Sequence, residues 1–195
     1  MNARLIAITQ IIFAILTTSF VTDCKKEYKG DDPEYFKKIE ESQAYLKARI
    51  KDSYEISDLS NTKEEAVYRF LEAVQNEQTD RYIFTKEEYI NIFLPNTLDE
   101  NTLSTTMPLE QAWKFTDMRR YIALESLQNL FKKHKKQKFK IETLTWREEV
   151  RQLKALKGHR VGNLTISFGN EKATLEEVRL VVEHRGKFKV CVIGT

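Results

Sequence analysis

A chain of 195 residues with a formal net charge of +3 is long enough for one domain with a sizeable core. Its only cysteines are Cys24 and Cys191, which excludes cysteine-ligated metal clusters and allows at most one disulfide. The three histidines, His134, His159 and His184, follow one another at intervals of 25 residues with no cysteine or carboxylate at ligand spacing, so we expect no metal and no other cofactor.

The first 23 residues have the three parts of an export signal. Arg4 supplies the charged start, an interrupted apolar run covers Leu5–Leu16, and the small polar residues Thr17–Ser19 follow. The apolar run is too short to hold a chain stably across a bilayer. We therefore expect residues 1–23 to be a signal peptide and residues 24–32 to be a polar tether.

The position of Cys24 makes this signal resemble that of a bacterial lipoprotein, although Asp23 departs from the small residue usual before the cysteine. The resemblance implies that Cys24 becomes the acylated first residue of the mature chain and binds it to a lipid bilayer. Lys25 and Lys26 follow the cysteine, and under the sorting rules of lipoproteins they favour the outer over the inner membrane of the cell envelope. The alternatives are an ordinary cleaved signal, leaving the protein secreted or periplasmic, and an uncleaved anchor.

The domain is expected to begin with a helix. Asp32 stands at a capping position and Pro33 suits a first helical turn, so the helix should extend from about Pro33 to Lys51. Its apolar residues recur at helical spacing and are Phe36, Ile39, Leu46 and Ile50. Residues 53–60 are predicted to connect this helix to the next one.

Two further helices begin with the same four-residue signal, Thr-Lys-Glu-Glu, at Thr62 and at Thr85. In such a capping box the threonine and the glutamate three residues later satisfy each other's free backbone N–H groups. The predicted buried stripe of the first helix consists of Ala66, Val67, Phe70, Leu71 and Val74. The second helix is expected to be short, to bury Tyr89, Ile92 and Phe93, and to stop at Pro95.

A polar loop over residues 96–107 leads to the longest helical segment, which begins at Pro108. Its predicted apolar stripe consists of Leu109, Trp113, Tyr121, Leu124, Leu127 and Phe131. The stripe ends in a run of basic residues that starts at Lys132.

After Gln137 the apolar spacing changes to the two-residue period of strands. Strands are predicted over Phe139–Thr145, Val161–Phe168, Glu177–Glu183 and Phe188–Ile193. Gly186 is expected to supply the positive φ of the turn between the last two. Residues 147–157 fit either a continuing strand or a short helix.

Helices followed by an antiparallel meander of four or more strands predict an α+β fold, with the long helix packed on one face of a curved sheet. The inward positions assigned by the spacing predict one core that includes Phe70, Leu71, Trp113, Leu124, Val181 and Val190.

Two short motifs resemble the nuclear-transport-factor-2-like, or cystatin-like, domains. They are the capped helix with Phe70-Leu71 before Asn76-Glu77, and the closing hairpin of Val178–Val182, Gly186 and Lys187-Phe188-Lys189-Val190. The resemblance covers roughly residues 60–195 and implies a cone of helices and sheet, so residues 33–195 would be one domain with an extra helix and connection over 33–59. Some members of that family are enzymes that place an Asp, or a His with a Tyr, in the cone.

No catalytic residue of that family carries over to this chain, and no grouping of nucleophile, base and acid can be recognised in it. Asp117, which lies between Trp113 and Tyr121 on the long helix, is the acid that could face a ligand pocket formed by these three residues. We favour the simpler interpretation that Asp117 is a solvated surface charge near Arg119 and Arg120.

Charge is distributed unevenly along the chain. Residues 24–117 contain 13 basic and 20 acidic residues, whereas residues 118–160 contain 13 basic and 4 acidic ones. Lys132, Lys133, Lys135 and Lys136 could form an anion patch for nucleic acid, glycans or lipid headgroups. We favour a structural role, because cations are stabilised at the C-terminal end of a helix. Export argues against nucleic acid as a partner. Because the acidic part of the chain offers competing charges, we expect only weak, salt-sensitive binding of polyanions.

Two functional hypotheses follow. The first is a non-catalytic, membrane-tethered envelope lipoprotein whose domain binds a protein, a glycan or a small ligand. The second is an enzyme or a carrier of a hydrophobic small molecule, with its site in the cone between the long helix and the sheet. An open pocket with polar groups would favour the second, a cone filled by large side chains would favour surface binding, and a homo-oligomer is compatible with both.

Overall fold

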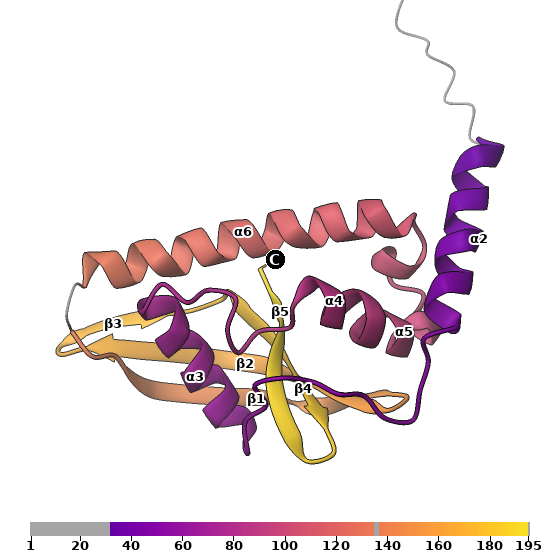
Figure 1. Ribbon diagram of the computed structural model, residues 1–195. Coiled ribbons are helices and arrows are strands. Elements are labelled where there is room, and N and C mark those ends of the chain that lie inside the picture. Colours follow the sequence, from indigo (N-terminus) through magenta and orange to yellow (C-terminus); the bar gives the residue numbers. More distant parts are fainter. Residues whose placement is uncertain (1–31, 135–136, 195) are drawn as a thin grey trace, which may run out of the picture. The chain divides into compact units, whose positions relative to one another are not determined.

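The computed structural model describes residues 32–134 and 137–194, so the predicted signal peptide, Cys24, Lys135 and Lys136 lie outside the described residues. The fold is α+β, as the sequence predicts. The main helices are α2 (Pro33–Lys47), α3 (Lys63–Gln75), α4 (Lys86–Glu88), α5 (Leu94–Asn96) and α6 (Leu109–Lys133). The strands are β1 (Lys140–Leu153), β2 (Leu156–Phe168), β3 (Glu171–Thr174), β4 (Val178–His184) and β5 (Lys187–Ile193), as Figure 1 shows.

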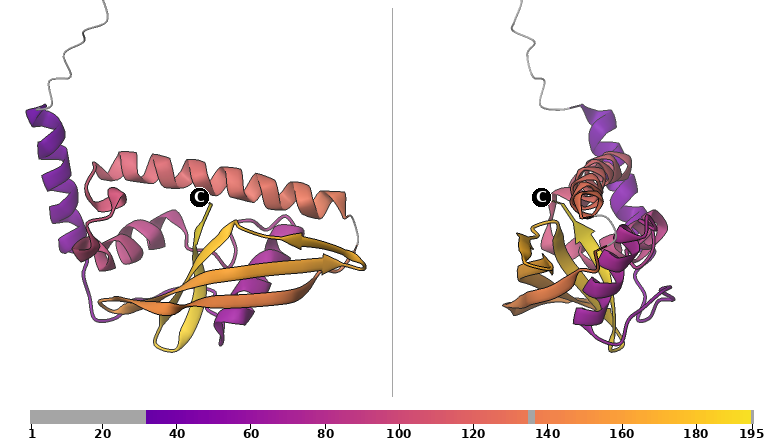
Figure 2. Two further views of the ribbon diagram at one scale, coloured as in Figure 1. Left: turned by 180° about the vertical axis from the view of Figure 1, so that it is seen from behind. Right: turned by 90° about the vertical axis from the view of Figure 1, so that its left-hand side faces the viewer.

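The five strands form one antiparallel sheet in the order β1-β2-β4-β5, with β3 paired to β2 outside that path. Two strands pair with the same edge of β2. Residues 157–160 pair with β4, and residues 165–168 pair with β3. α3 packs against β4, β5 and α6, and α6 also packs against β5 (Figures 1 and 2).

Residues 147–157 are strand, not helix. β1 continues to Leu153, the chain turns at Lys154 with a φ of 37°, and β2 begins at Leu156. In this extended form Leu153 and Leu156 are both buried, whereas the flanking charged residues remain at the surface. β3 is not predictable from the sequence, because most of its four residues are polar and it lacks an apolar alternation.

The first helix is shorter than predicted and buries less. α2 ends at Lys47, and Phe36 and Ile50 are 47% and 38% exposed, so only Leu46 of the predicted stripe is fully buried. The hydroxyl of Tyr54 accepts a hydrogen bond from the Lys51 N–H and donates one to the Arg49 carbonyl. The Arg49 carbonyl and the Lys51 N–H thus bond to a side chain and do not continue the hydrogen bonds of the helix.

Only one of the two predicted capping boxes is complete. Thr85 and Glu88 form a complete capping box, with hydrogen bonds of 3.1 Å and 2.9 Å in the two directions. The Thr62 hydroxyl accepts a hydrogen bond from the Glu65 N–H, but the Glu65 carboxylate accepts one from the Asn61 N–H, which leaves this capping box incomplete. The predicted buried stripe of α3 is confirmed in full.

Pro95 does not stop the helix that begins at Lys86. A π-helical segment, Tyr89–Phe93, follows α4, and the Leu94 N–H donates to the carbonyl of Tyr89, five residues earlier. The helix then continues through Pro95 to Asn96 in α5. The wider π turn changes which backbone groups bond to each other ahead of Pro95. The helix therefore tolerates the proline ring and the missing N–H.

The buried side chains form two clusters. Phe70, Leu71, Val181 and Val190 lie in the first, and Leu124 packs against it half-buried, as predicted. Trp113 was wrongly assigned to this core and packs against the second cluster, which contains Leu46, Phe84, Phe93 and Cys191.

The predicted buried stripe of α6 is only partly right. Leu127 and Phe131 are buried, but Tyr121 is 67% exposed, and Ala112, Arg120 and Ala123 take the inward positions instead. The buried face of α6 therefore combines small residues with Arg120, Leu127 and Phe131.

Candidate functional site

Trp113, Asp117 and Tyr121, the three residues of the predicted pocket, line one cavity of about 390 Å³. They lie on one flank of α6, since their spacing returns each side chain to the same side of the helix. The segment that leads into α4 forms the opposite wall. We call this cavity the α6 cleft; it is lined by Asp80, Thr85, Lys86, Glu87, Trp113, Asp117, Arg120, Tyr121 and Leu124.

Arg120 is the buried charge of the α6 cleft. It is 8% exposed, and its Nη1 donates a hydrogen bond of 2.8 Å to the carbonyl of Phe84. Among the residues that the structure describes, no other hydrogen-bond acceptor and no ion-pairing carboxylate meets the guanidinium. The fork of an arginine carries five N–H donors, so most of its capacity is available to a group in the cleft.

Arg120 stays charged although its surroundings lower its pKa. Burial lowers the pKa of the guanidinium, while Cys191, Asp117 and Asp80 act in the opposite direction. An arginine remains protonated at neutral pH despite such shifts. Arg120 therefore places a permanent positive charge at the cleft in a poorly solvated position, where electrostatic attraction is stronger than at an exposed site.

The aromatic side chains supply the apolar part of the cleft. The Trp113 ring lies 5.6 Å from Lys86 Nζ and 5.7 Å from the Arg120 guanidinium, measured to the ring centroid. It also packs against Tyr89, with 5.9 Å between the ring centroids. Tyr89 is 5% exposed, and burial raises the pKa of its hydroxyl. Trp113 is thus held in place on one side and half-exposed on the other.

The acids of the α6 cleft lie at its rim. Asp80, Glu87 and Asp117 are all exposed, so solvent screens their charges more than that of Arg120. The sequence predicts Trp113, Asp117 and Tyr121 as pocket residues, but not the buried Arg120, nor Asp80 and Lys86. Arg120 lies at helical spacing on the same face of α6 as Ala112, Ala123 and Leu127, and this spacing could have indicated that it is buried.

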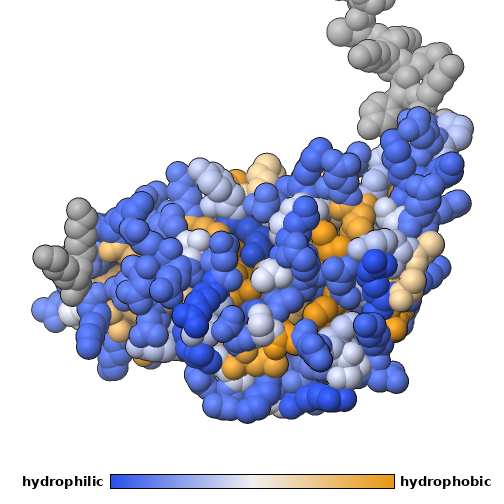
Figure 3. All heavy atoms as spheres, viewed as in Figure 1, coloured by the Kyte–Doolittle hydropathy of each residue, from blue (hydrophilic) through white to orange (hydrophobic). Residues whose placement is uncertain are grey.

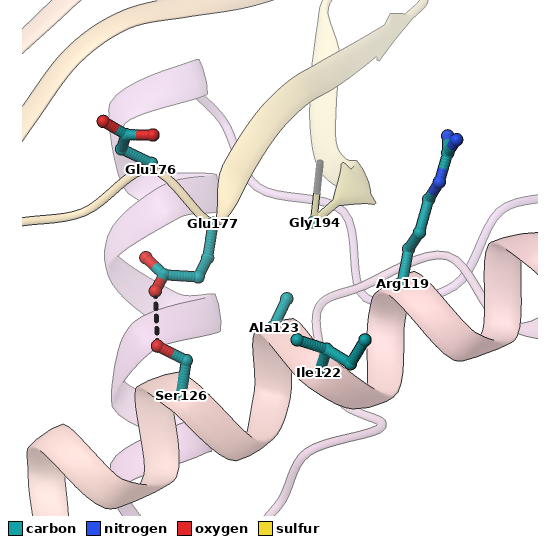
Figure 4. A pocket seen from close by; sticks show the side chains of 7 residues that line it. All are labelled: Arg119, Ile122, Ala123, Ser126, Glu176, Glu177 and Gly194. Carbon is teal, nitrogen blue, oxygen red and sulfur yellow. Dashed lines mark hydrogen bonds between the residues drawn. The ribbon is translucent and has the colours of Figure 1, made fainter. Parts of the chain in front are cut away.

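A second cavity, of about 280 Å³, lies between α6 and the segments next to β4 and β5 (Figure 4). The Ser126 hydroxyl donates a hydrogen bond of 2.6 Å to Glu177 Oε1, and Arg119 points away from both. Glu177 lines this cavity, and its Oε2 is buried without a hydrogen-bond partner among the described residues, but the cavity is smaller than the α6 cleft and has no buried positive charge in its lining. The α6 cleft is therefore the better candidate.

The space between α6 and the sheet is occupied by the first core cluster. Phe131 packs against Phe139 and Phe168, and Leu127 is fully buried beside them. The open volume lies beside α6 and not under it.

The basic run is divided between a helix end and the segment that follows. Lys132 and Lys133 form the exposed last turn of α6, and Lys133 Nζ lies 3.4 Å from Glu171. His134 caps the helix and stacks on Phe168, with ring centroids 4.1 Å apart. These two lysines thus occupy the helix end where a structural role was predicted.

Each histidine has structural partners. His159 lies 2.8 Å from Glu183 Oε2, and His184 accepts from the Tyr54 N–H and faces the Ala155 carbonyl. In the described ranges no cluster of His, Cys, Asp or Glu is suited to a metal ion. Cys191 is buried, and its burial raises the pKa of the thiol well above the ordinary value, which keeps it protonated and poorly nucleophilic.

None of the helices formed by residues 32–134 and 137–194 combines the length and the apolar character needed to cross a membrane. No protein-family model, curated protein or solved structure matches the chain.

Proposed function

We propose that the protein is a non-catalytic binding protein that uses the α6 cleft to hold a small ligand with an anionic group next to an apolar ring. The observation that carries this proposal is the 8% exposed Arg120, whose guanidinium faces the cleft with a single protein acceptor. An anionic group would occupy the remaining donors, and Trp113 and Tyr121 would contact the ring. The filled space between α6 and the sheet favours binding at this lateral cleft over a site in the interior.

The proposal also places the protein in the cell envelope, preferably at the outer membrane, through an acylated Cys24. The sequence of residues 1–24 supports it: a charged start, a short apolar run and a cysteine. A secreted or periplasmic protein is the alternative. The fold is proposed to be a variant of the cystatin-like arrangement, supported by a long helix and α3 packed against an antiparallel sheet.

An enzyme or carrier with a site at α6 is the second candidate. Asp117 and the rim acids give it acid–base groups, and Thr85, Lys86 and Tyr121 line the same cleft. We retain binding as the conclusion because the buried charge is an arginine, which holds anions and does not exchange protons near neutral pH.

Replacing Arg120 by Lys should weaken the binding of an aromatic carboxylate, with benzoate as the probe. Lysine keeps a donor for the Phe84 carbonyl but loses the fork, and hydrogen bonds to charged groups contribute about 1.5–3 kcal/mol, so about a tenfold to hundredfold loss of affinity is expected. Calorimetric titration of benzoate, benzamide and benzylamine measures this directly.

The matched control is Arg119→Lys, the exposed neighbour that does not line the cleft. It should bind benzoate as the unaltered protein does. Tighter binding of benzylamine than of benzoate, or an unchanged benzoate affinity in Arg120→Lys, would assign the cleft to cationic ligands and contradict the proposal.

Replacing Cys24 by Ser should release the protein from membranes into the soluble fraction, because the acyl chains can no longer be attached. A single short chain binds a bilayer only marginally, so stable retention of the unaltered protein implies two or more chains. Membrane fractionation and mass measurement of the purified protein check this. Retention of Cys24→Ser at the membrane would instead indicate an uncleaved N-terminal anchor.

A further inference from the structure

The middle of the outward face of α6 carries three exposed apolar side chains, where a solvated helix face is ordinarily polar. Phe115, Met118 and Ile122 follow one another at intervals of three and four residues and are 49%, 53% and 58% exposed. Hydrophobic spheres stand at the upper edge of Figure 3, over the middle of α6. Side chains of this kind grouped on one helix face mark a contact surface. We call these three residues the α6 ridge.

The chain enters the domain at the head of the α6 ridge. Gln111 precedes Phe115 by one helical turn on the same face, and its side-chain oxygen lies 3.5 Å from the hydroxyl of Tyr35 in the first turns of α2. The Leu109 N–H also donates to Ser42 Oγ at 2.9 Å. Between Cys24 and Pro33 stand eight residues, which can span at most about 30 Å. A chain held at Cys24 would therefore keep the ridge near the point of attachment.

The charges on this face favour an anionic surface. Lys114 flanks the ridge. Lys132 and Lys133 lie farther along, at the C-terminal end of α6, and Glu125 lies between them and the ridge. Lys114 and Lys133 have exposed ion-pair partners at 3.3 Å and 3.4 Å. Exposed pairs of this kind contribute little and leave the lysines free to meet other anions.

We propose that the α6 ridge lies against the bilayer that carries the acylated Cys24, with Phe115, Met118 and Ile122 at the level of the headgroups and the flanking lysines on anionic lipids. The proposal rests on the proposed acylation. A tethered surface needs little affinity of its own, because the anchor keeps its effective concentration high. Tyr121 lies beside the ridge and also lines the α6 cleft, so the cleft would open next to the membrane surface.

The test uses the full-length, membrane-purified protein in vesicles of phosphatidylethanolamine and phosphatidylglycerol. Met118→Cys is labelled with an environment-sensitive fluorophore, which the buried Cys191 does not take up, and Glu148→Cys on the exposed part of β1 is the matched control. Lipids with brominated acyl chains should quench the label at position 118 about twofold or more and leave position 148 unchanged. Adding Phe115→Ser and Ile122→Ser should abolish the quenching without detaching the protein.

Flotation of the unlabelled protein with the vesicles separates the two proposals. If the protein floats and position 118 is not quenched, the ridge does not contact the bilayer and the acyl anchor stands. If the protein does not float, both proposals are overturned. If the fluorescence of the label changes with the protein-to-lipid ratio but not with bromination, the ridge contacts a second copy of the chain. That result would overturn the membrane contact.

Discussion

Replacing Lys189 by Met is expected to lower the free energy of unfolding by about 3–5 kcal/mol, because it leaves the carboxylate of Glu88 buried without a countercharge. Lys189 is 2% exposed, and its Nζ lies 3.0 Å and 2.8 Å from the two carboxylate oxygens of Glu88. A third contact, of 3.3 Å, joins Nζ to Ser57 Oγ. Urea denaturation of the purified protein measures the loss.

Two further variants show whether charge is the cause. Lys187→Met, on the same strand but with an exposed side chain, should change stability by no more than about 0.5 kcal/mol. Glu88→Gln combined with Lys189→Met should recover part of the loss, since a neutral amide needs no countercharge. Equal losses in Lys189→Met and Lys187→Met would show that the buried pair does not determine stability.

Truncating Phe70 to Ala should cost about 3–5 kcal/mol, the range typical of a large aromatic side chain removed from a packed core. Phe70 is fully buried on α3, in the cluster that joins this helix to α6 and to the sheet. The cavity left behind cannot collapse, because three elements meet there. Thermal and chemical denaturation should agree on the size of the effect.

Tyr68, two residues earlier on the same helix, is the matched aromatic control. It is 42% exposed and touches Phe139 at the edge of the core, with 5.3 Å between the ring centroids. Tyr68→Ala is therefore expected to cost about 1 kcal/mol or less. A loss as large as that of Phe70→Ala would contradict the assignment of the inward face of α3.

Regular elements with clear spacing were predictable from the sequence. The buried stripe of α3, the start of α6 after Pro108 and the closing hairpin at Gly186 follow from side-chain period, capping and turn chemistry, which act within a few residues. The predictions were wrong where the chain uses a local hydrogen-bond pattern that the apolar spacing does not show. Tyr54 ends α2 early, and a π turn carries the next helix past Pro95.

The candidate site was predictable only in part. Trp113, Asp117 and Tyr121 share a flank of one helix, so the sequence alone could place them side by side. It could not show that the segment over residues 80–87 faces them, nor that Trp113 belongs to the second core cluster.

The sequence by itself determined the order of the main helices and of four of the five strands, the α+β class and most of the inward positions, because periodicity records which side of each element avoids water. The tertiary structure alone decided which polar side chains are buried. Arg120 meets the Phe84 carbonyl across 36 residues, and Lys189 meets Glu88 across 101 residues. A buried charge is stable only beside a specific partner, and that partner comes from another part of the chain, so no local pattern announces it.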